Sequence, residues 1–319
     1  MRNLMVAAAS AVCLTSPLGA QVDTTQPWTW SNDKVKRTIG AVRAGRSLAP
    51  KAWPGGAKVA VLLSFDVDNE TVFLAPLAPG RPNIGGLSQG EYGARIGLKR
   101  VLDLLAKHKI PASFFMPAMS LELHPEIIPA IKAAGHHEFG VHGWIHELNS
   151  TLPADAERDL VRRAMDYFEK AVGSRPVGYR APSWNFSPST LSILRELGLI
   201  YDSSLMSDDS PYELMADGQP TGIVELPVEW ILDDAPLLNP RGDRYSAPDQ
   251  LLKVWMDEFD KAYEEGTTFT LTMHPHIIGH RSRIVILERL IEHIKKKPNV
   301  WFGTHRAAVE YAKAQARMM

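Results

Sequence analysis

Short apolar runs alternate with helix-period segments from Lys58 almost to the end of the chain. Residues 58–65, KVAVLLSF, have the composition of a buried strand. In residues 93–109 the apolar side chains recur every three or four positions, which is typical of an amphipathic helix. The alternation continues over roughly 260 residues, and it predicts a parallel sheet with helical crossovers, either open or closed into a barrel.

Chemically capable side chains follow several of these predicted strands. Asp66 and Asp68 come at the end of the first strand, and His142, Arg180 and His274 end later ones. In parallel α/β sheets and barrels, ligands bind beyond the carboxyl ends of the strands. Because a strand sends alternate residues to one face, Asp66 and Asp68 should point into the same pocket. The sequence therefore predicts a functional site at this edge of the sheet.

The segment VHGWIHE places His142 and His146 four residues apart. On a helical turn, residues with this spacing share a face, so two imidazoles can converge on one metal ion. The chain contains 11 histidines, so the spacing alone is weak evidence. Two histidines with one carboxylate and an open position, however, form the ligand set of a catalytic zinc-type site. The acids after the first strand make such a site the favoured interpretation.

Four motifs, in this order, resemble those of the polysaccharide deacetylases, also called the NodB-homology domain or carbohydrate esterase family 4. They are SFDVDNE, GHHEFGVHGWIHE, RAPSW and LTMH, and the resemblance covers residues 58–318. It implies an α/β fold, a distorted (β/α) barrel of about seven parallel strands. It also implies a metal-dependent hydrolase of carbon–nitrogen bonds other than peptide bonds.

The resemblance further implies roles for individual residues. Asp66 would be the catalytic base, and Arg180 would orient it. Asp68 would hold one divalent metal ion together with His142 and His146, and zinc is preferred over cobalt or nickel. The base and the metal ligands would then share one pocket.

The remaining roles fall on the last two motifs. A backbone N–H near Ser183 or Trp184 would help to hold the oxyanion. His274 would protonate the leaving nitrogen as the general acid. Asp209 is the candidate partner of the His274 imidazole, and Asp202 is the alternative.

Three tryptophans lie in or beside these motifs: Trp144, Trp184 and Trp230. Each has a flat apolar face that suits a wall for a sugar or another ring, and each is equally suited to buried packing. All three are candidate substrate residues.

Two departures from the family pattern bear on the substrate. Val67 separates the two acids that most members place side by side, and Glu147 stands where a proline often follows the second histidine. With these features the chain looks like a branch that includes peptidoglycan-deacetylase-like proteins and hydrolases of cyclic imides or ureides. The chemistry is therefore better specified than the substrate.

Three functions stay open. The leading hypothesis is an N-deacetylase of polysaccharide or peptidoglycan that contains N-acetylglucosamine. The long connection at residues 71–93 would suit a lid over a small pocket, which favours a small cyclic imide or amide as substrate, as in an imidase or allantoinase. The third is a catalytically inactive carbohydrate-binding protein, which would not need acid, base and metal ligands together.

The N-terminal residues indicate export. Residues 1–20 combine one positive charge, a short apolar stretch and small residues, as secretory signals do. Residues 21–56 would form an N-terminal extension, and residues 57–319 the catalytic domain. A net charge of −1 gives no indication of nucleic-acid binding, and no apolar run is long enough to span a bilayer. We expect a periplasmic or secreted protein that acts on an N-acetylated glycan or a small amide.

Overall fold

The computed structural model describes residues 26–74, 82–238 and 246–318. The chain divides into two compact units, Met1–Ile39 and Gly40–Met319. In the described part of the first unit, a short 3₁₀ helix at Pro27–Thr29 precedes helix α1 (Asn32–Gly40). The predicted signal at residues 1–20 lies outside the described residues.

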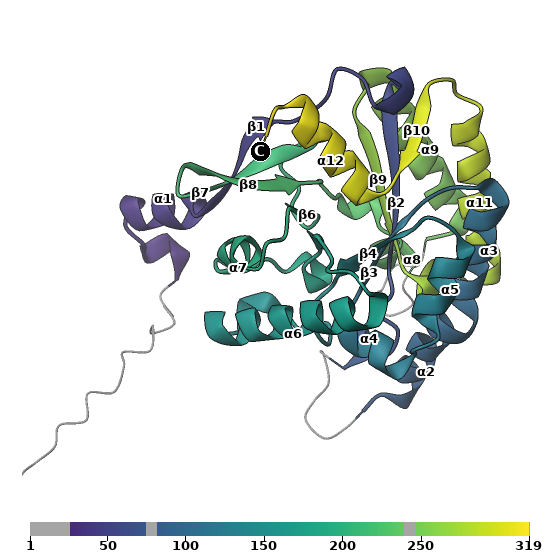
Figure 1. Cartoon of the computed structure of the whole chain (residues 1–319), viewed down its shortest axis with the longest axis horizontal. Coiled ribbons are helices and arrows are strands. Elements are labelled where there is room, and N and C mark those ends of the chain that lie inside the picture. The colour runs from purple at the N-terminus through teal and green to yellow at the C-terminus, as the bar shows by residue number, and fades with distance from the viewer. Residues whose placement is uncertain (1–25, 75–81, 239–245, 319) are drawn as a thin grey trace, which may run out of the picture. The chain divides into compact units, whose positions relative to one another are not determined.

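The second unit alternates strands and helices (Figure 1). Its strands are β1 (Val42–Ser47), β2 (Val59–Asp66), β3 (Ser113–Met116), β4 (Glu138–Val141), β5 (Gly178–Tyr179), β6 (Tyr201–Asp202), β7 (Tyr212–Ala216), β8 (Gln219–Glu225), β9 (Thr268–Met273) and β10 (Val300–Gly303). Its α-helices are α2 (Ile84–Tyr92), α3 (Leu98–His108), α4 (Ala118–Leu123), α5 (Ile127–Ala134), α6 (Ala154–Val172), α7 (Thr190–Glu196), α8 (Ala235–Leu238), α9 (Pro248–Glu265), α10 (Pro275–Ile278), α11 (Arg281–Lys295) and α12 (His305–Gln315). Among the helices that the structure describes, none has the length and apolar composition needed to cross a membrane.

The strands form one sheet, in which β2 is central. Strand β9 pairs with β2 along its length, β10 pairs with the first half of β2, and β3 pairs with the second half. From β3 the sheet continues in parallel through β4, β5, β6 and β8. Strands β7 and β1 follow with antiparallel pairing. Because β1 lies between residues 21 and 56, part of the expected N-terminal extension joins the sheet.

The sheet curls towards closure between β8 and β9. Asp233, in the segment after β8, forms a single parallel bridge to Thr272 of β9. Strand β8 itself pairs with β6 and β7, not with β9. The result is the predicted distorted barrel, built mostly of parallel strands whose carboxyl ends share one rim.

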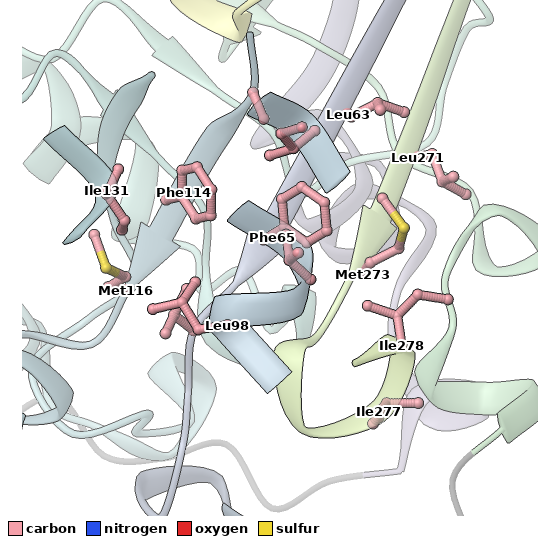
Figure 2. Packing of buried hydrophobic residues seen from close by; sticks show 14 of the residues in the cluster. Leu63, Phe65, Leu98, Phe114, Met116, Ile131, Leu271, Met273, Ile277 and Ile278 are labelled. Carbon is pink, nitrogen blue, oxygen red and sulfur yellow. The ribbon is translucent and has the colours of Figure 1, made fainter. Parts of the chain in front are cut away.

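An apolar layer separates the sheet from the helices outside it (Figure 2). Every second residue of the run from Val59 to Val67 belongs to this layer and has no exposed surface. These residues pack with β3 and β9 and with helices that include α3, α5 and α11. Figure 2 shows Leu98 of α3 and Ile131 of α5 in this layer. The strand period of two thus fixes which face of β2 meets the helices.

The intervening residues of β2 face the inside of the curl. Ala60 and Leu62 pack there with Trp53 and with helix α12. Ser64 and Asp66 follow on the same face, closer to the carboxyl end of the strand. The inner face therefore changes from apolar to polar towards the rim.

The connection expected at residues 71–93 contains regular structure. A 3₁₀ helix occupies Thr71–Phe73, and helix α2 begins at Ile84. A π-helix, Gly93–Gly97, joins α2 to α3. A Cβ atom on Gly97 would lie 2.0 Å from the Pro275 carbonyl oxygen, so this glycine permits close packing against α10. Residues 75–81 of the connection lie outside the described residues.

Candidate metal and catalytic site

The predicted acids and histidines meet at the carboxyl rim of the strands. Asp66 ends β2, Asp68 follows two residues later, and His142 and His274 come directly after β4 and β9. These side chains line one cavity of about 300 Å³, and His146 lines it with them. Both acids thus point into one pocket, as the strand period predicts, while Val67 between them is buried in the outer layer.

Asp68, His142 and His146 form a buried cluster whose ligand atoms lie within 4.8 Å of one another. The distance from Asp68 Oδ1 to His142 Nε2 is 3.6 Å, and that from Asp68 Oδ2 to His146 Nε2 is 3.8 Å. Neither oxygen of Asp68 has a hydrogen-bond partner among the described residues. Because a buried carboxylate without partners is costly, this donor set fits a divalent ion of the zinc type.

Burial of the cluster favours the imidazole form that binds metal. It lowers the pKa of both His142 and His146 to about 4, although neighbouring carboxylates oppose the shift. Both imidazoles are therefore neutral near pH 7, and neutral imidazole is the metal-binding form. Burial also raises the pKa of Asp68, against the attraction of His146 and His274. A bound cation would restore the carboxylate.

The two histidines converge through a tight turn, not through the helical turn that their spacing predicts. In this turn Gly143 (φ 75°) and His146 (φ 63°) have left-handed backbone conformations. The His142 Nδ1 atom lies 2.8 Å from the Arg180 carbonyl oxygen, which directs its Nε2 into the cavity. The prediction of convergence was therefore right, and the prediction of a helix was wrong.

A buried arginine holds Asp66. Arg180 Nη1 donates to Asp66 Oδ1 at 2.6 Å and to Ser64 Oγ at 3.0 Å. Arg180 also donates to the Ser203 carbonyl oxygen at 2.9 Å and the Ser203 hydroxyl at 3.0 Å, and it lies 3.4 Å from His305 Nε2. Burial alone would raise the pKa of Asp66, but the Arg180 guanidinium and nearby imidazoles lower it below its usual value. Asp66 is thus an ionised carboxylate with one oxygen held in place.

The partner of His274 is Asp234, which corrects the prediction of Asp209. The His274 Nδ1 atom lies 2.6 Å from Asp234 Oδ1, and the His274 backbone N–H donates to Asp234 Oδ2 at 3.0 Å. Asp233 Oδ1 lies 3.6 Å from the same Nδ1. Burial would lower the pKa of His274, but Asp234 and Asp233 together raise it well above its ordinary value. The imidazole is therefore protonated near pH 7, and its Nε2 lies 3.7 Å from Asp68 Oδ2.

Asp209 and Asp202 lie elsewhere. Asp209 is exposed, and its backbone oxygen accepts a hydrogen bond from Thr268 Oγ1 at the start of β9. His274 follows the other end of that strand, roughly 20 Å away at the usual rise per residue. Asp202 is buried and hydrogen-bonds Glu225. Neither aspartate partners the His274 imidazole.

Two of the three predicted tryptophans line the cavity. The ring centres of Trp184 and Trp230 are 4.2 Å apart, and Trp230 is 48% exposed. Trp144 lies in the outer apolar layer instead. There the Arg163 guanidinium sits 3.6 Å from its ring centre, and Tyr167 meets the ring edge-on. Trp144 therefore forms no wall of the cavity, because its side chain packs against α6.

The chain bends sharply at the predicted oxyanion donors. Ser183 (φ 53°) and Trp184 (φ 52°) both have left-handed backbone conformations within a 3₁₀ turn. The Trp184 N–H already donates to the Ala181 carbonyl oxygen at 2.8 Å. Ser183 lines the cavity. Of the two predicted donors, the Trp184 N–H is therefore already engaged within the turn.

Comparison with known proteins finds relatives across most of the chain. Residues 91–201 match the family model described as polysaccharide deacetylase. A peptidoglycan deacetylase of Helicobacter pylori is 30% identical over 289 residues, which cover 81% of this chain and 98% of the relative. The likeness therefore extends well beyond the segment that the family model matches.

Solved structures share both fold and sequence with this chain. A putative polysaccharide deacetylase from Mycobacterium smegmatis is 33% identical with a TM-score of 0.78, and the match covers 86% of this chain and 96% of that one. The PuuE allantoinase is 26% identical with a TM-score of 0.74, and the match covers 85% and 94% of the two chains. With the curled parallel sheet and with 30% identity across almost the whole of a curated relative, the chain belongs to the polysaccharide deacetylase family.

Proposed function

We propose that the protein is a metal-dependent N-deacetylase that acts on N-acetylglucosamine units of peptidoglycan or a related polysaccharide. One observation carries the proposal: a candidate metal set lies in the same cavity as two other groups. These are the Asp66 carboxylate, which Arg180 holds, and the His274 imidazole, which Asp234 holds. Hydrolysis of an amide by a metal-activated water uses each of these functions. Their presence together also speaks against a catalytically inactive carbohydrate-binding protein.

Asp68, His142 and His146 would hold one divalent ion. Zinc is the first choice because two imidazoles and one carboxylate are a ligand set of catalytic zinc sites, and cobalt or nickel are the alternatives. When bound, such an ion polarises a carbonyl group and lowers the pKa of water. The neutral imidazoles and the unpartnered Asp68 carboxylate support this assignment.

Asp66 would act as the general base. Arg180 occupies its Oδ1, which leaves Oδ2 to accept the proton of the attacking water. The lowered pKa of Asp66 keeps this group ionised at neutral pH, as a base requires. The Ser183 N–H would stabilise the negative charge that develops on the carbonyl oxygen.

His274 would act as the general acid. Asp234 holds its Nδ1, so the proton on Nε2 faces the cavity. The raised pKa of His274 keeps that proton in place until the amide nitrogen takes it as the carbon–nitrogen bond breaks. Without this transfer, an amine would be a poor leaving group.

Two observations support an amino-sugar substrate. The peptidoglycan deacetylase and the putative polysaccharide deacetylase described above are 30% and 33% identical to this chain, against 26% for the allantoinase. In addition, Trp184 and Trp230 provide apolar ring faces at the cavity, and such faces stack well against sugar rings.

A small cyclic imide or ureide is the alternative substrate. The similarity to an allantoinase structure favours it, as does a cavity of about 300 Å³, which is at the small end for ligand sites. The lid expected at residues 71–93 also belongs to this alternative, and Val72 from that segment lines the cavity.

An activity panel decides between these substrates. Purified protein loaded with zinc or cobalt would be given acetylated chitooligosaccharides, peptidoglycan and cyclic imides, with released acetate and ring opening scored separately. Acetate from a glycan without ring opening is the expected result. Rapid imide ring opening with no acetate from any glycan would reverse the choice. No turnover by fully metal-loaded protein would favour the inactive binding protein.

We also propose that the protein is exported and that residues 1–20 are removed. Their signal-like composition supports this, and a polymer substrate outside the cytoplasm is consistent with it. N-terminal sequencing of protein recovered from outside the cytoplasm should begin near Gln21. Recovery of intact Met1 there would defeat the idea.

A further inference from the structure

Glu147, the residue that stands where the family often has a proline, closes the turn between the two histidines. Its Oε1 accepts the Trp144 N–H at 2.9 Å. Its Oε2 accepts the Ile145 N–H at 2.7 Å and lies 3.1 Å from the Trp144 nitrogen. One carboxylate thus accepts hydrogen bonds from two successive backbone amides of the histidine turn, which we define as residues 142–147.

The conformation of this turn needs such support. Gly143 and His146 both have positive φ, which is an unfavourable region for the bulky side chain of His146. A Cβ atom on Gly143 would lie 2.9 Å from Glu147 Oε1 and 2.9 Å from Pro182 Cγ. The Glu147 carboxylate therefore fills the space that the missing side chain of Gly143 leaves.

The two histidines differ in how their rings are held. The His142 ring is anchored by the contact of its Nδ1 with the Arg180 carbonyl oxygen. The His146 Nδ1 atom is buried and has no hydrogen-bond partner among the described residues. The position of the His146 ring therefore depends on the backbone that carries it, and that backbone belongs to the turn closed by Glu147.

We propose that Glu147 is a positioning residue that preorganises His146 for metal binding. It acts through the backbone of the histidine turn, in place of the ring hydrogen bond that usually orients a metal-ligating histidine. The inference rests on the proposed function, since it assumes the divalent site at Asp68, His142 and His146. It assigns Glu147 a function that proline cannot perform, because proline has no side-chain acceptor.

The test measures metal affinity rather than turnover. Zinc affinity of wild-type protein, Glu147→Ala and Glu147→Gln would be determined by competition with a chromophoric chelator. The visible spectrum of each cobalt-loaded protein would report the ligand geometry. Glu169→Ala, which removes an exposed carboxylate from α6, is the control for loss of negative charge. Thermal melting of the metal-free proteins would check that each variant folds.

We expect Glu147→Ala to weaken zinc binding about 10- to 100-fold and to alter the cobalt spectrum. Glu147→Gln keeps a carbonyl acceptor and should remain within a few-fold of wild type. Equal losses in both variants would assign the effect to charge and overturn the proposal, and so would unchanged affinity in Glu147→Ala. If Glu147→Ala does not fold, a large loss in Glu147→Gln alone overturns it as well. Failure of wild-type protein to bind any divalent ion would instead refute the proposed function itself.

Discussion

The carboxylate of Asp234 contacts His274 at two points: Oδ1 lies 2.6 Å from the imidazole Nδ1, and Oδ2 accepts the backbone N–H at 3.0 Å. In the first contact the carboxylate accepts the Nδ1 proton and stabilises the imidazolium, whose Nε2 then carries a proton into the cavity; the second contact fixes the residue that bears the ring. Asp234 therefore controls both the charge and the orientation of the proposed acid.

Asp234→Asn should lower kcat by about 10²- to 10⁴-fold, the usual range for loss of a positioned proton donor. Its amide cannot hold the imidazole as a cation, so the acid loses its proton too readily. Metal content should not change, since the proposed ligands are Asp68, His142 and His146 and do not include Asp234. Asp209→Asn is the matched control and should behave as wild type, because Asp209 lies at the opposite end of β9. A large loss in Asp209→Asn with none in Asp234→Asn would contradict the assignment.

The candidate metal set can be tested by metal analysis of purified variants. Wild-type protein should hold about one divalent ion, and a strong chelator should abolish its activity. Asp68→Ala, His142→Ala and His146→Ala should each lose the ion. Asp66→Asn should keep it and lose turnover, because Asp66 is held by Arg180 and serves as base. If Asp66→Asn loses the metal while Asp68→Ala retains it, the two acids have been assigned the wrong way round.

The sequence predicted the positions of Asp66, Asp68, His142 and His274 at one rim because they follow from local periodicity. Alternation along β2 places Asp66 and Asp68 on one side and Val67 on the other. The ends of β4 and β9 then bring His142 and His274 to the same rim. Such placements need only the strand period and the parallel order of the sheet.

Other parts of the site depend on contacts that local sequence does not encode. The chain contains two Asp-Asp pairs, 208–209 and 233–234, and no local feature of the sequence shows which of them lies beside His274. The bridge between Asp233 and Thr272 sets the second pair beside the histidine, and only the tertiary fold makes that bridge. Similarly, the residues around Arg180 in the sequence do not indicate that its side chain contacts Ser203 and His305. The glycine in VHGWIHE favours a turn, but the spacing of four residues between the histidines favoured the interpretation as a helical turn.

The buried Asp202 predicts a pH-dependent stability. Burial raises its pKa from 3.8 to about 6, although hydrogen bonds from Glu225 and Ser204 oppose the shift. In the folded protein the group thus keeps its proton to a higher pH than in the unfolded chain. The stability that it contributes is fully present below pH 3.8 and is lost as the pH rises through 6.

Asp202→Asn cannot ionise and should escape the part of this loss that Asp202 contributes, whereas Glu225, whose pKa is raised by burial and by Asp202, still titrates. Its melting temperature, relative to wild type, should rise between pH 5 and pH 8 by an amount on the order of 2–4 °C. Asp155→Asn, at a side chain that is 92% exposed, is the control and should show no such trend. A difference between Asp202→Asn and wild type that stays constant over this pH range would show that the carboxyl titrates normally in the folded protein.

The half-exposed ring of Trp230 gives a test of substrate size. It lines the cavity beside Trp184 and extends into solvent, where a sugar next to the reacting unit could stack on it. Trp230→Ala should therefore lower kcat/KM for a long acetylated oligosaccharide about 10-fold, which corresponds to a stacking energy of about 1.4 kcal/mol. The loss should appear mainly in KM and should shrink as the oligosaccharide is shortened to one unit. Val285→Ala, an exposed apolar side chain on α11, is the control. An equal loss for every chain length would place Trp230 against the reacting group itself, and a loss confined to cyclic imides would support the small-substrate alternative.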